Sequence, residues 1–339
     1  MSDLPKLTQF SPGAGCGCKI SCGDLEILLK KQASTASFPG LVVGNQDRDD
    51  AAVFDIGNGQ AIISTTDFFT PIVDSPYDFG RIASVNAISD IYAMGGKPLM
   101  AIAILGWPLD KLPLTVANQV IEGSRAVCQE AGIPLAGGHS IEISDPIFGL
   151  AVTGISAKDQ IKQNSTATAG SSLFLTKPLG VGIISTAEKR GVAAPADTNA
   201  IVRSMTTLNR AGEQLAQLEA VCAMTDVTGF GLLGHLLEIC EGSGLQAQID
   251  FDNVPLIDNL LTYIEHQTLP GGLFKNFKSY GHKISLLTDL QKYVLCDPQT
   301  SGGLLVAVSE NGREKVIALM ESIGQPFYEI VRLLPAEPD

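Results

Sequence analysis

The sequence predicts an α+β fold, because predicted strands are often neighbours along the chain and are mixed with helices in both halves. Of its 339 residues, 45% are hydrophobic, which is ample for sizeable cores, and a chain of this length is expected to form about two domains. Only 6% of the residues are aromatic, so aliphatic side chains must fill those cores. No fixed-period repeat or low-complexity tract interrupts the pattern.

The first half contains a Gly/Cys-rich head over residues 1–40 and a predicted domain over residues 41–157. Two strands are expected at residues 51–56 and 61–66, joined by a turn at Gly57-Asn58-Gly59. The following elements, in chain order, are a helix over 81–94 that Gly95-Gly96 ends, a buried strand over 99–105, a helix over 115–131 capped by Thr115, and strands over 133–136 and 147–156.

The second half is expected to form a C-terminal domain over residues 158–339. Residues 157–171 are rich in Lys, Gln, Ser, Thr and Ala, which predicts a boundary there. The expected elements are a strand over 172–176, a long helix over 197–219 capped by Asp197, a strand over 221–224, a helix over 232–240, strands over 247–251 and 303–308, a helix over 311–323 and a strand over 327–333.

The net charge and the cysteine content indicate which classes of protein this chain can belong to. A net charge of −13 argues against a nucleic-acid groove and suits an enzyme that offsets its acidity with divalent cations. Residues 1–10 are polar and unlike a signal peptide, and the apolar stretch over 99–107 is too short to span a bilayer. Seven scattered cysteines are typical of a reducing compartment. These features predict a cytoplasmic protein with no membrane or direct nucleic-acid partner.

The head carries two thiols and an ammonium in Gly13-Ala14-Gly15-Cys16-Gly17-Cys18-Lys19. Glycine at every second position lets this segment rearrange cheaply, as a flap over a site must. Lys19 is expected to help hold Cys16 or Cys18 as a thiolate. The alternatives are a plain disordered tail or a metal-binding fragment with Cys22, although structural zinc needs four ligands.

Several aspartates stand where strands end or helices turn inward. Asp49 and Asp50 precede the first strand, Asp67 ends the second, and Asp226 ends a short strand of the second half. Asp90 lies in an apolar helix, four residues after Asn86 and therefore on the same face. Each has a simple structural reading as a turn, cap or surface residue. As a group they indicate a Mg²⁺ site that works with substrate phosphates.

Two glycine-rich motifs could bind phosphates. Gly137-Gly138-His139-Ser140 can turn tightly and present backbone N–H groups to an anion, or it is an ordinary turn. Residues 229–234 fit G-x-G-x-x-G, and Asp250 follows at a ribose-binding distance, as in a dinucleotide-binding unit. The strand before that motif is short, and no second such unit follows.

Together these segments resemble the selenophosphate synthetase (selenide, water dikinase) family, within the aminoimidazole ribonucleotide synthetase-like superfamily. The resemblance runs from about residue 7 to the end of the chain, and the Cys-Gly-Cys-Lys head is its specific part. The motifs that carry it are Gly15-Cys16-Gly17-Cys18-Lys19, Thr65-Thr66-Asp67-Phe68-Phe69, residues 86–96, Gly137-Gly138-His139-Ser140, residues 225–231 and Asp297-Pro298-Gln299-Thr300-Ser301-Gly302-Gly303.

The resemblance implies a two-domain fold whose N-terminal domains pair into a homodimer around a barrel. It implies Cys16 as the selenium-handling residue and Lys19 as an essential contact to phosphates. The expected Mg²⁺ ligands are Asp50, Asp90 and Asp226. The expected ATP contacts are Lys19, Asp47, Arg48, Asp49, Asp67, Asp90, Gly138, His139 and Ser140. It gives no clear role to Cys18 or Cys22.

The implied reaction converts ATP, selenide and water into selenophosphate, AMP and phosphate, with several Mg²⁺ ions per site. K⁺ is a candidate second cofactor, and a protein that delivers selenium is a candidate partner beside ATP and free selenide. Two other functions remain open on the sequence: another ATP-dependent kinase or synthetase of the superfamily, and a non-catalytic selenium carrier. Neither explains both the head and the aspartates.

Overall fold

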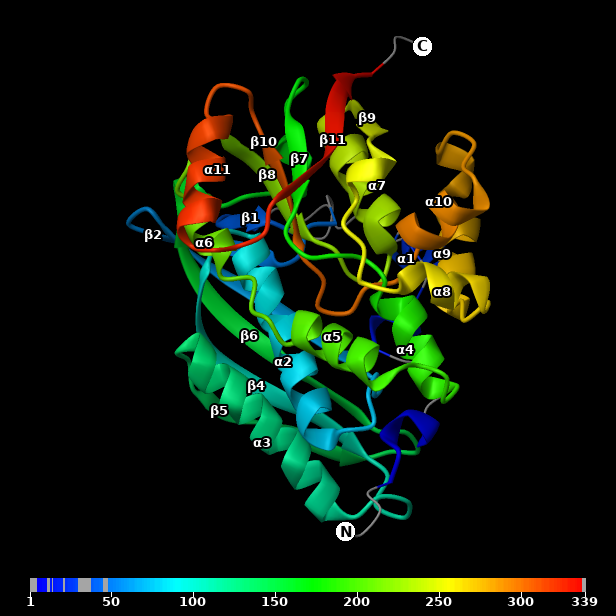
Figure 1. The fold of residues 1–339 in the computed structure, drawn as a ribbon. Helices are drawn as coiled ribbons and strands as arrows, with labels where there is room; N and C mark the ends of the chain where they lie inside the picture. Colours follow the sequence, from blue (N-terminus) through cyan, green and yellow to red (C-terminus); the bar gives the residue numbers. More distant parts are fainter. Residues whose placement is uncertain are drawn as a thin grey trace.

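The protein, seen in a computed structural model, is built around two β-sheets with helices packed against them (Figure 1). The structure describes residues 5–10, 13, 15–20, 22–29, 38–44 and 48–336. The first sheet belongs to the N-terminal half of the chain and the second to the C-terminal half. This is the α+β architecture that the sequence predicts.

The first sheet has six strands in the order β1-β2-β3-β6-β4-β5, and only the β4–β5 pair is parallel. Its strands are β1 (Leu41–Val43), β2 (Ala52–Gly57), β3 (Gln60–Phe69), β4 (Lys97–Trp107), β5 (Leu135–Glu142) and β6 (Ile147–Ala157). The predicted β2–β3 turn is confirmed. Asn58 and Gly59 form a two-residue loop with φ of 54° and 73°, and these positive values match the twist of a tight hairpin.

Helices α2 (Pro76–Ala93) and α3 (Leu114–Ala131) lie together on one face of this sheet (Figure 1). They cross closely because each has a glycine at the contact. A Cβ at Gly80 would lie 1.9 Å from the Val120 carbonyl oxygen, and one at Gly123 would lie 2.0 Å from the Tyr77 carbonyl oxygen. Helix α2 begins five residues before its predicted start, because the Ser75 side chain caps it and Pro76 occupies its first turn.

The second sheet has five strands in the order β8-β10-β7-β11-β9, all antiparallel. Its strands are β7 (Ser172–Leu175), β8 (Val221–Asp226), β9 (Leu245–Ile249), β10 (Leu304–Val308) and β11 (Tyr328–Pro335). A dinucleotide-binding unit needs parallel strands joined by a helix, so the G-x-G-x-x-G alternative is wrong. Gly231 instead begins helix α7 (Gly231–Ser243), with φ of 71°.

The remaining helices surround the second sheet and cover the space between the sheets (Figure 1). They are α4 (Val181–Lys189), α5 (Pro195–Met205), α6 (Ala211–Leu215), α8 (Leu260–Glu265), α9 (Gly271–Tyr280), α10 (Asp289–Leu295) and α11 (Arg313–Ser322). The head contributes two 3-10 turns (Leu7–Phe10 and Cys16–Cys18) and helix α1 (Cys22–Leu29). Within the described residues, no helix combines the length and apolar character needed to cross a bilayer.

Four local predictions are wrong. The strand predicted to be buried over 99–105 is β4, but its Met100 and Ile102 side chains are exposed, because α2 and α3 cover only one face of the sheet. The long helix predicted over 197–219 is two helices, α5 and α6, because Thr206 and Thr207 hydroxyls bond back to the α5 carbonyls and end it. Asp197 lies in the first turn of α5, where it accepts hydrogen bonds from Tyr263 and Asn259 instead of capping the helix. Thr115 is likewise the second residue of α3, whose N-cap is Pro113.

Candidate active site

Three carboxylates from distant parts of the sequence meet between the two sheets. Asp50 precedes β2, Asp90 lies in the buried face of α2, and Asp226 ends β8. One oxygen of each lies within 4.8 Å of the others. Opposite ligands of an octahedral Mg²⁺ are about 4.2 Å apart. The three oxygens are therefore close to the spacing that a single divalent cation requires.

Hydroxyl groups fix the orientation of each carboxylate. Thr65 Oγ1 donates to Asp90 Oδ2 at 2.5 Å, Ser89 Oγ donates to Asp226 Oδ2 at 2.5 Å, and Thr225 Oγ1 donates to Asp50 Oδ1 at 2.9 Å. The hydroxyls leave other carboxylate oxygens available. Asp50 Oδ2 in particular is buried and has no hydrogen-bond partner among the described residues.

The negative charges of the three neighbouring carboxylates favour the binding of a cation. Burial raises the pKa of Asp50, Asp90 and Asp226 above the usual range, and Asp226 raises the pKa of the other two further. Three buried carboxylates at this spacing cannot all ionise without strong mutual repulsion. A bound divalent cation removes that repulsion and satisfies the unpartnered Asp50 oxygen. The donor set, all oxygen and anionic, fits Mg²⁺.

Beside the cluster, Lys19, Asp67, Asn86 and Cys16 form a continuous chain of contacts. Lys19 Nζ lies 2.7 Å from Asp67 Oδ2, and Asn86 Nδ2 donates to the same oxygen at 2.8 Å. Asn86 Oδ1 accepts from Cys16 Sγ at 3.3 Å. Burial lowers the pKa of Lys19, but the charge and the hydrogen bond of Asp67 outweigh this effect and raise that pKa well above its usual value. The ammonium therefore stays charged.

The head is held in this position by the C-terminal half of the chain. Cys16 N donates to Thr300 Oγ1 at 2.9 Å, and Ser301 N donates to Asn86 Oδ1 at 2.8 Å. Gly229 makes room for the head, since a Cβ there would lie 2.6 Å from the Cys16 carbonyl oxygen. Asn86 therefore connects the head, α2 and the loop before β10.

The prediction of a thiolate stabilised by Lys19 is wrong for Cys16 in this arrangement. The side chain is fully buried, and burial raises the pKa of its thiol far above the usual value, although Lys19 lowers it in part. The thiol is therefore protonated and donates to Asn86. Cys18, in contrast, is exposed.

Other predicted ATP contacts lie elsewhere or outside the description. Asp47 lies outside the described residues. Arg48 is exposed, with its guanidinium 3.6 Å from Glu241, and Asp49 Oδ1 accepts from Asn164 N at 2.7 Å. Arg48 and Asp49 directly precede Asp50 in the sequence, so their backbone lies next to the carboxylate cluster.

Gly138, His139 and Ser140 do not form the predicted turn. They lie within edge strand β5, exposed to solvent, because parallel pairing with β4 extends the backbone there. Gly138 is in register with Asp67 across β4 and β6. Three strand spacings separate them, about 14 Å. Within one chain, these residues do not reach the carboxylates.

The sequence alone did not reveal several residues that complete the site. Thr65, Ser89, Thr225 and Thr300 act through single hydroxyls, a residue type too common to single out. Asn209 lies in the break between α5 and α6, and its Nδ2 donates to Ser89 Oγ at 2.8 Å and to the Gly302 carbonyl at 2.9 Å. The signal for the four hydroxyl residues was their place in the motifs at 65–69, 86–96, 225–231 and 297–303, whereas Asn209 lies in none of these motifs.

Comparisons with known proteins agree with this fold. Residues 48–156 match the family described as AIR synthase related protein, N-terminal domain, and residues 168–335 match its C-terminal domain. Thiamine-monophosphate kinase from Stenotrophomonas maltophilia K279a has a similar fold, with a TM-score of 0.64 at 19% identity over 93% of both chains. Hydrogenase maturation protein HypE in complex with ATP gives 0.63 at 19% identity, over 88% of this chain and 83% of that chain.

Close relatives narrow the family further. The selenide, water dikinase of Photorhabdus laumondii is 59% identical over 324 residues, which cover 96% of this chain and 93% of the relative. That of Colwellia psychrerythraea is 58% identical over 329 residues, 96% of either protein. Identity at this level over nearly the whole length leaves no large part of the chain unaccounted for. The chain belongs to the selenide, water dikinase family.

Proposed function

We propose that the chain makes selenophosphate: ATP, selenide and water give selenophosphate, AMP and phosphate. The observation that carries this beyond the family name is the position of the Cys16 head directly beside a three-carboxylate cluster. A sibling kinase has no use for the head, and a passive selenium carrier has no use for the carboxylates. The site combines both.

We assign Asp50, Asp90 and Asp226 as ligands of Mg²⁺, on the basis of their spacing, their all-oxygen chemistry and the unpartnered Asp50 oxygen. A divalent cation held there neutralises phosphate charge during phosphoryl transfer. Asp67 positions Lys19, whose ammonium adds a point charge for the phosphates. K⁺ stays a candidate second cofactor.

Cys16 is assigned to handling the selenium nucleophile. Selenide attacks the γ-phosphorus as the bond to the ADP oxygen breaks, and ADP is then hydrolysed to AMP and phosphate. The buried head excludes bulk water from this site, which favours attack by selenide over attack by water in the first step.

Anaerobic ³¹P NMR of the protein with Mg-ATP, with and without selenide, tests this function. We expect selenide-dependent AMP, phosphate and a selenium-coupled phosphorus signal. ADP as the final product, or turnover indifferent to selenide, would instead place the chain with the sibling kinases. Stoichiometric selenium binding without ATP turnover would identify a carrier.

We also propose a homodimer formed through the first sheet. The face opposite α2 carries large exposed side chains, Phe54, Phe68, Met100 and Ile102, each between 45% and 46% exposed. An apolar surface of this extent is typical of a protein–protein interface. Strand β5 forms an edge of the same sheet. A second copy that covers this face closes the two sheets into a barrel and brings the partner's β5 toward the ATP site.

The position of Gly138, His139 and Ser140 supports this pairing. They lie about 14 Å from Asp67 in their own chain, three strand spacings away, so a nucleotide that contacts both within one chain would have to extend across β6 and β4. We therefore propose that they contact ATP bound by the partner subunit. The domain boundary near residues 157–171 stays our proposal as well.

Replacing Ile102 with aspartate is expected to separate the dimer into monomers, because it places a charge at the centre of the apolar face. Sedimentation or light scattering measures the mass. The matched control is Leu114→Asp, on α3 and 66% exposed, which is expected to leave the mass unchanged. A wild-type monomer, or a dimer that survives Ile102→Asp, would contradict the interface.

A further inference from the structure

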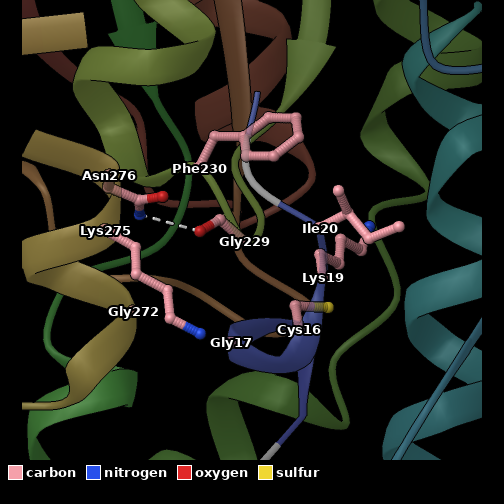
Figure 2. A pocket seen from close by; sticks show the side chains of 9 residues that line it. All are labelled: Cys16, Gly17, Lys19, Ile20, Gly229, Phe230, Gly272, Lys275 and Asn276. Carbon is pink, nitrogen blue, oxygen red and sulfur yellow. Dashed lines mark hydrogen bonds between the residues drawn. The ribbon is translucent and has the colours of Figure 1, made fainter. Parts of the chain in front are cut away.

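A small pocket opens on the outer side of the head, between the Cys16–Cys18 turn and helix α9 (Figure 2). Its enclosed part is about the size of a single water molecule. Gly17, Gly229 and Gly272 contribute backbone to its wall. Among the described residues, Lys19 and Lys275 contribute the only ionisable side chains apart from the Cys16 thiol, and no carboxylate lines the pocket.

The two lysines of the pocket differ in their charge balance. Lys19 extends inward to Asp67, which compensates its charge at 2.7 Å. Lys275 extends from α9 toward Gly17 in Figure 2 and is exposed, and within the described part of the chain no hydrogen bond or ion pair is recorded for it. The pocket therefore carries a net positive charge directly outside the cysteine turn.

We propose that this pocket binds the selenium substrate as the hydroselenide anion, with Lys275 as its counter-ion, before the head admits it to the carboxylate site. Hydrogen selenide is a strong enough acid to be a monoanion at neutral pH. A single selenium centre needs far less room at this small pocket than a phosphate group, which also requires several donors. The inference rests on the proposed function and adds a substrate entry site to it.

The position of the head explains why an outer site is useful. The Cys16 thiol points inward to Asn86, so the turn lies between the pocket and the inner site. The described residues of the cysteine turn contact their surroundings through the hydrogen bonds of Cys16 with Thr300 and Asn86, that of Gly15 N with the Thr70 carbonyl, and the ion pair of Lys19 with Asp67. An anion held at Lys275 lies next to the segment that must move to let it pass.

Kinetics of Lys275→Gln test the proposal. The KM for hydroselenide is expected to rise about fivefold, as for the loss of one nearby charge pair in a partly solvated site, while the KM for ATP and kcat stay unchanged. Lys275→Arg keeps the charge and is expected to restore the wild-type KM. The matched control is Lys278→Gln, in the same helix and also exposed. A KM for hydroselenide within twofold of wild type, or a loss confined to kcat, overturns the proposal.

A second measurement is independent of turnover. In a Cys18→Ser background, the alkylation rate of Cys16 is compared for iodoacetate, an anion, and iodoacetamide, which is neutral. The ratio of the two rates cancels differences in head opening and in thiol ionisation. It is expected to fall severalfold in Lys275→Gln and not in Lys278→Gln; an unchanged ratio overturns the anion site. Absence of selenide-dependent AMP in the wild type would instead refute the proposed function.

Discussion

Asp50→Asn is expected to abolish Mg²⁺-dependent turnover and, at the same time, to raise the melting temperature of the metal-free protein. Activity falls by about a thousandfold, because one ligand is lost where phosphate charge must be neutralised. Stability rises because burial and Asp226 already hold the pKa of Asp50 well above its usual range. Removing one of three mutually repelling carboxylates relieves that penalty by a few degrees. A stabilised but inactive variant indicates a binding site rather than a structural ion cluster.

The stability of the metal-free protein is expected to fall as the pH rises. An acid whose pKa is raised on folding binds more protons folded than unfolded, so stability is greatest below the usual pKa of Asp and falls as pH rises. In EDTA, the wild type is therefore expected to lose stability from about pH 4 upward, and Asp50→Asn to lose less. Calorimetry with and without Mg²⁺ measures both effects. The control is Asp110→Asn, at an exposed position between β4 and α3. A metal-free variant less stable than wild type would contradict the proposed repulsion.

Cys16→Ser is expected to abolish selenophosphate formation and leave ATP binding nearly intact. Serine keeps a donor for Asn86 Oδ1, and the backbone contact of residue 16 with Thr300 does not depend on the side chain. The head should therefore stay in place, with Lys19 still beside Asp67. What is lost is the polarisable sulfur to which we assign the handling of selenium. Anaerobic ³¹P NMR measures the product, and nucleotide titration measures binding.

The matched control for this substitution is Cys18→Ser. Cys18 belongs to the same turn but is exposed, and its substitution is expected to leave selenophosphate output unchanged. Normal output from Cys16→Ser would remove Cys16 from the reaction. Loss of ATP binding would show that residue 16 supports the fold of the nucleotide site instead.

The sequence predicts best those parts of the site that depend on residue type and on a few neighbouring residues in the chain. Asp50 and Asp226 stand at strand ends and Asp90 in an apolar helix, so residue type and position alone suggest ligands. The β2–β3 hairpin is predicted for the same reason, since Asn58-Gly59 determines its own turn. Such features depend on a few neighbouring residues and need no knowledge of the tertiary structure.

The errors come from contacts between distant residues. Asn86 and Ser301 are 215 positions apart, and no local sequence pattern predicts their hydrogen bond. The break between α5 and α6 brings Asn209 to Ser89, which helix propensity alone does not foresee. The Gly137-Gly138 pair resembles a turn until β4 extends it as a strand. The sequence predicts a thiolate at Cys16 or Cys18, and the burial that keeps the Cys16 thiol protonated is visible only in the fold.

The division of the carboxylates between the two halves of the chain limits how this enzyme can change in evolution. Asp50 and Asp90 belong to the first sheet and its helix, whereas Asp226 belongs to the second sheet. Neither half carries all three of the proposed Mg²⁺ ligands, so neither can be exchanged or inherited alone as a functional module. Recombination within the superfamily must keep the two halves together, or find a new partner that supplies the missing oxygen at the same place.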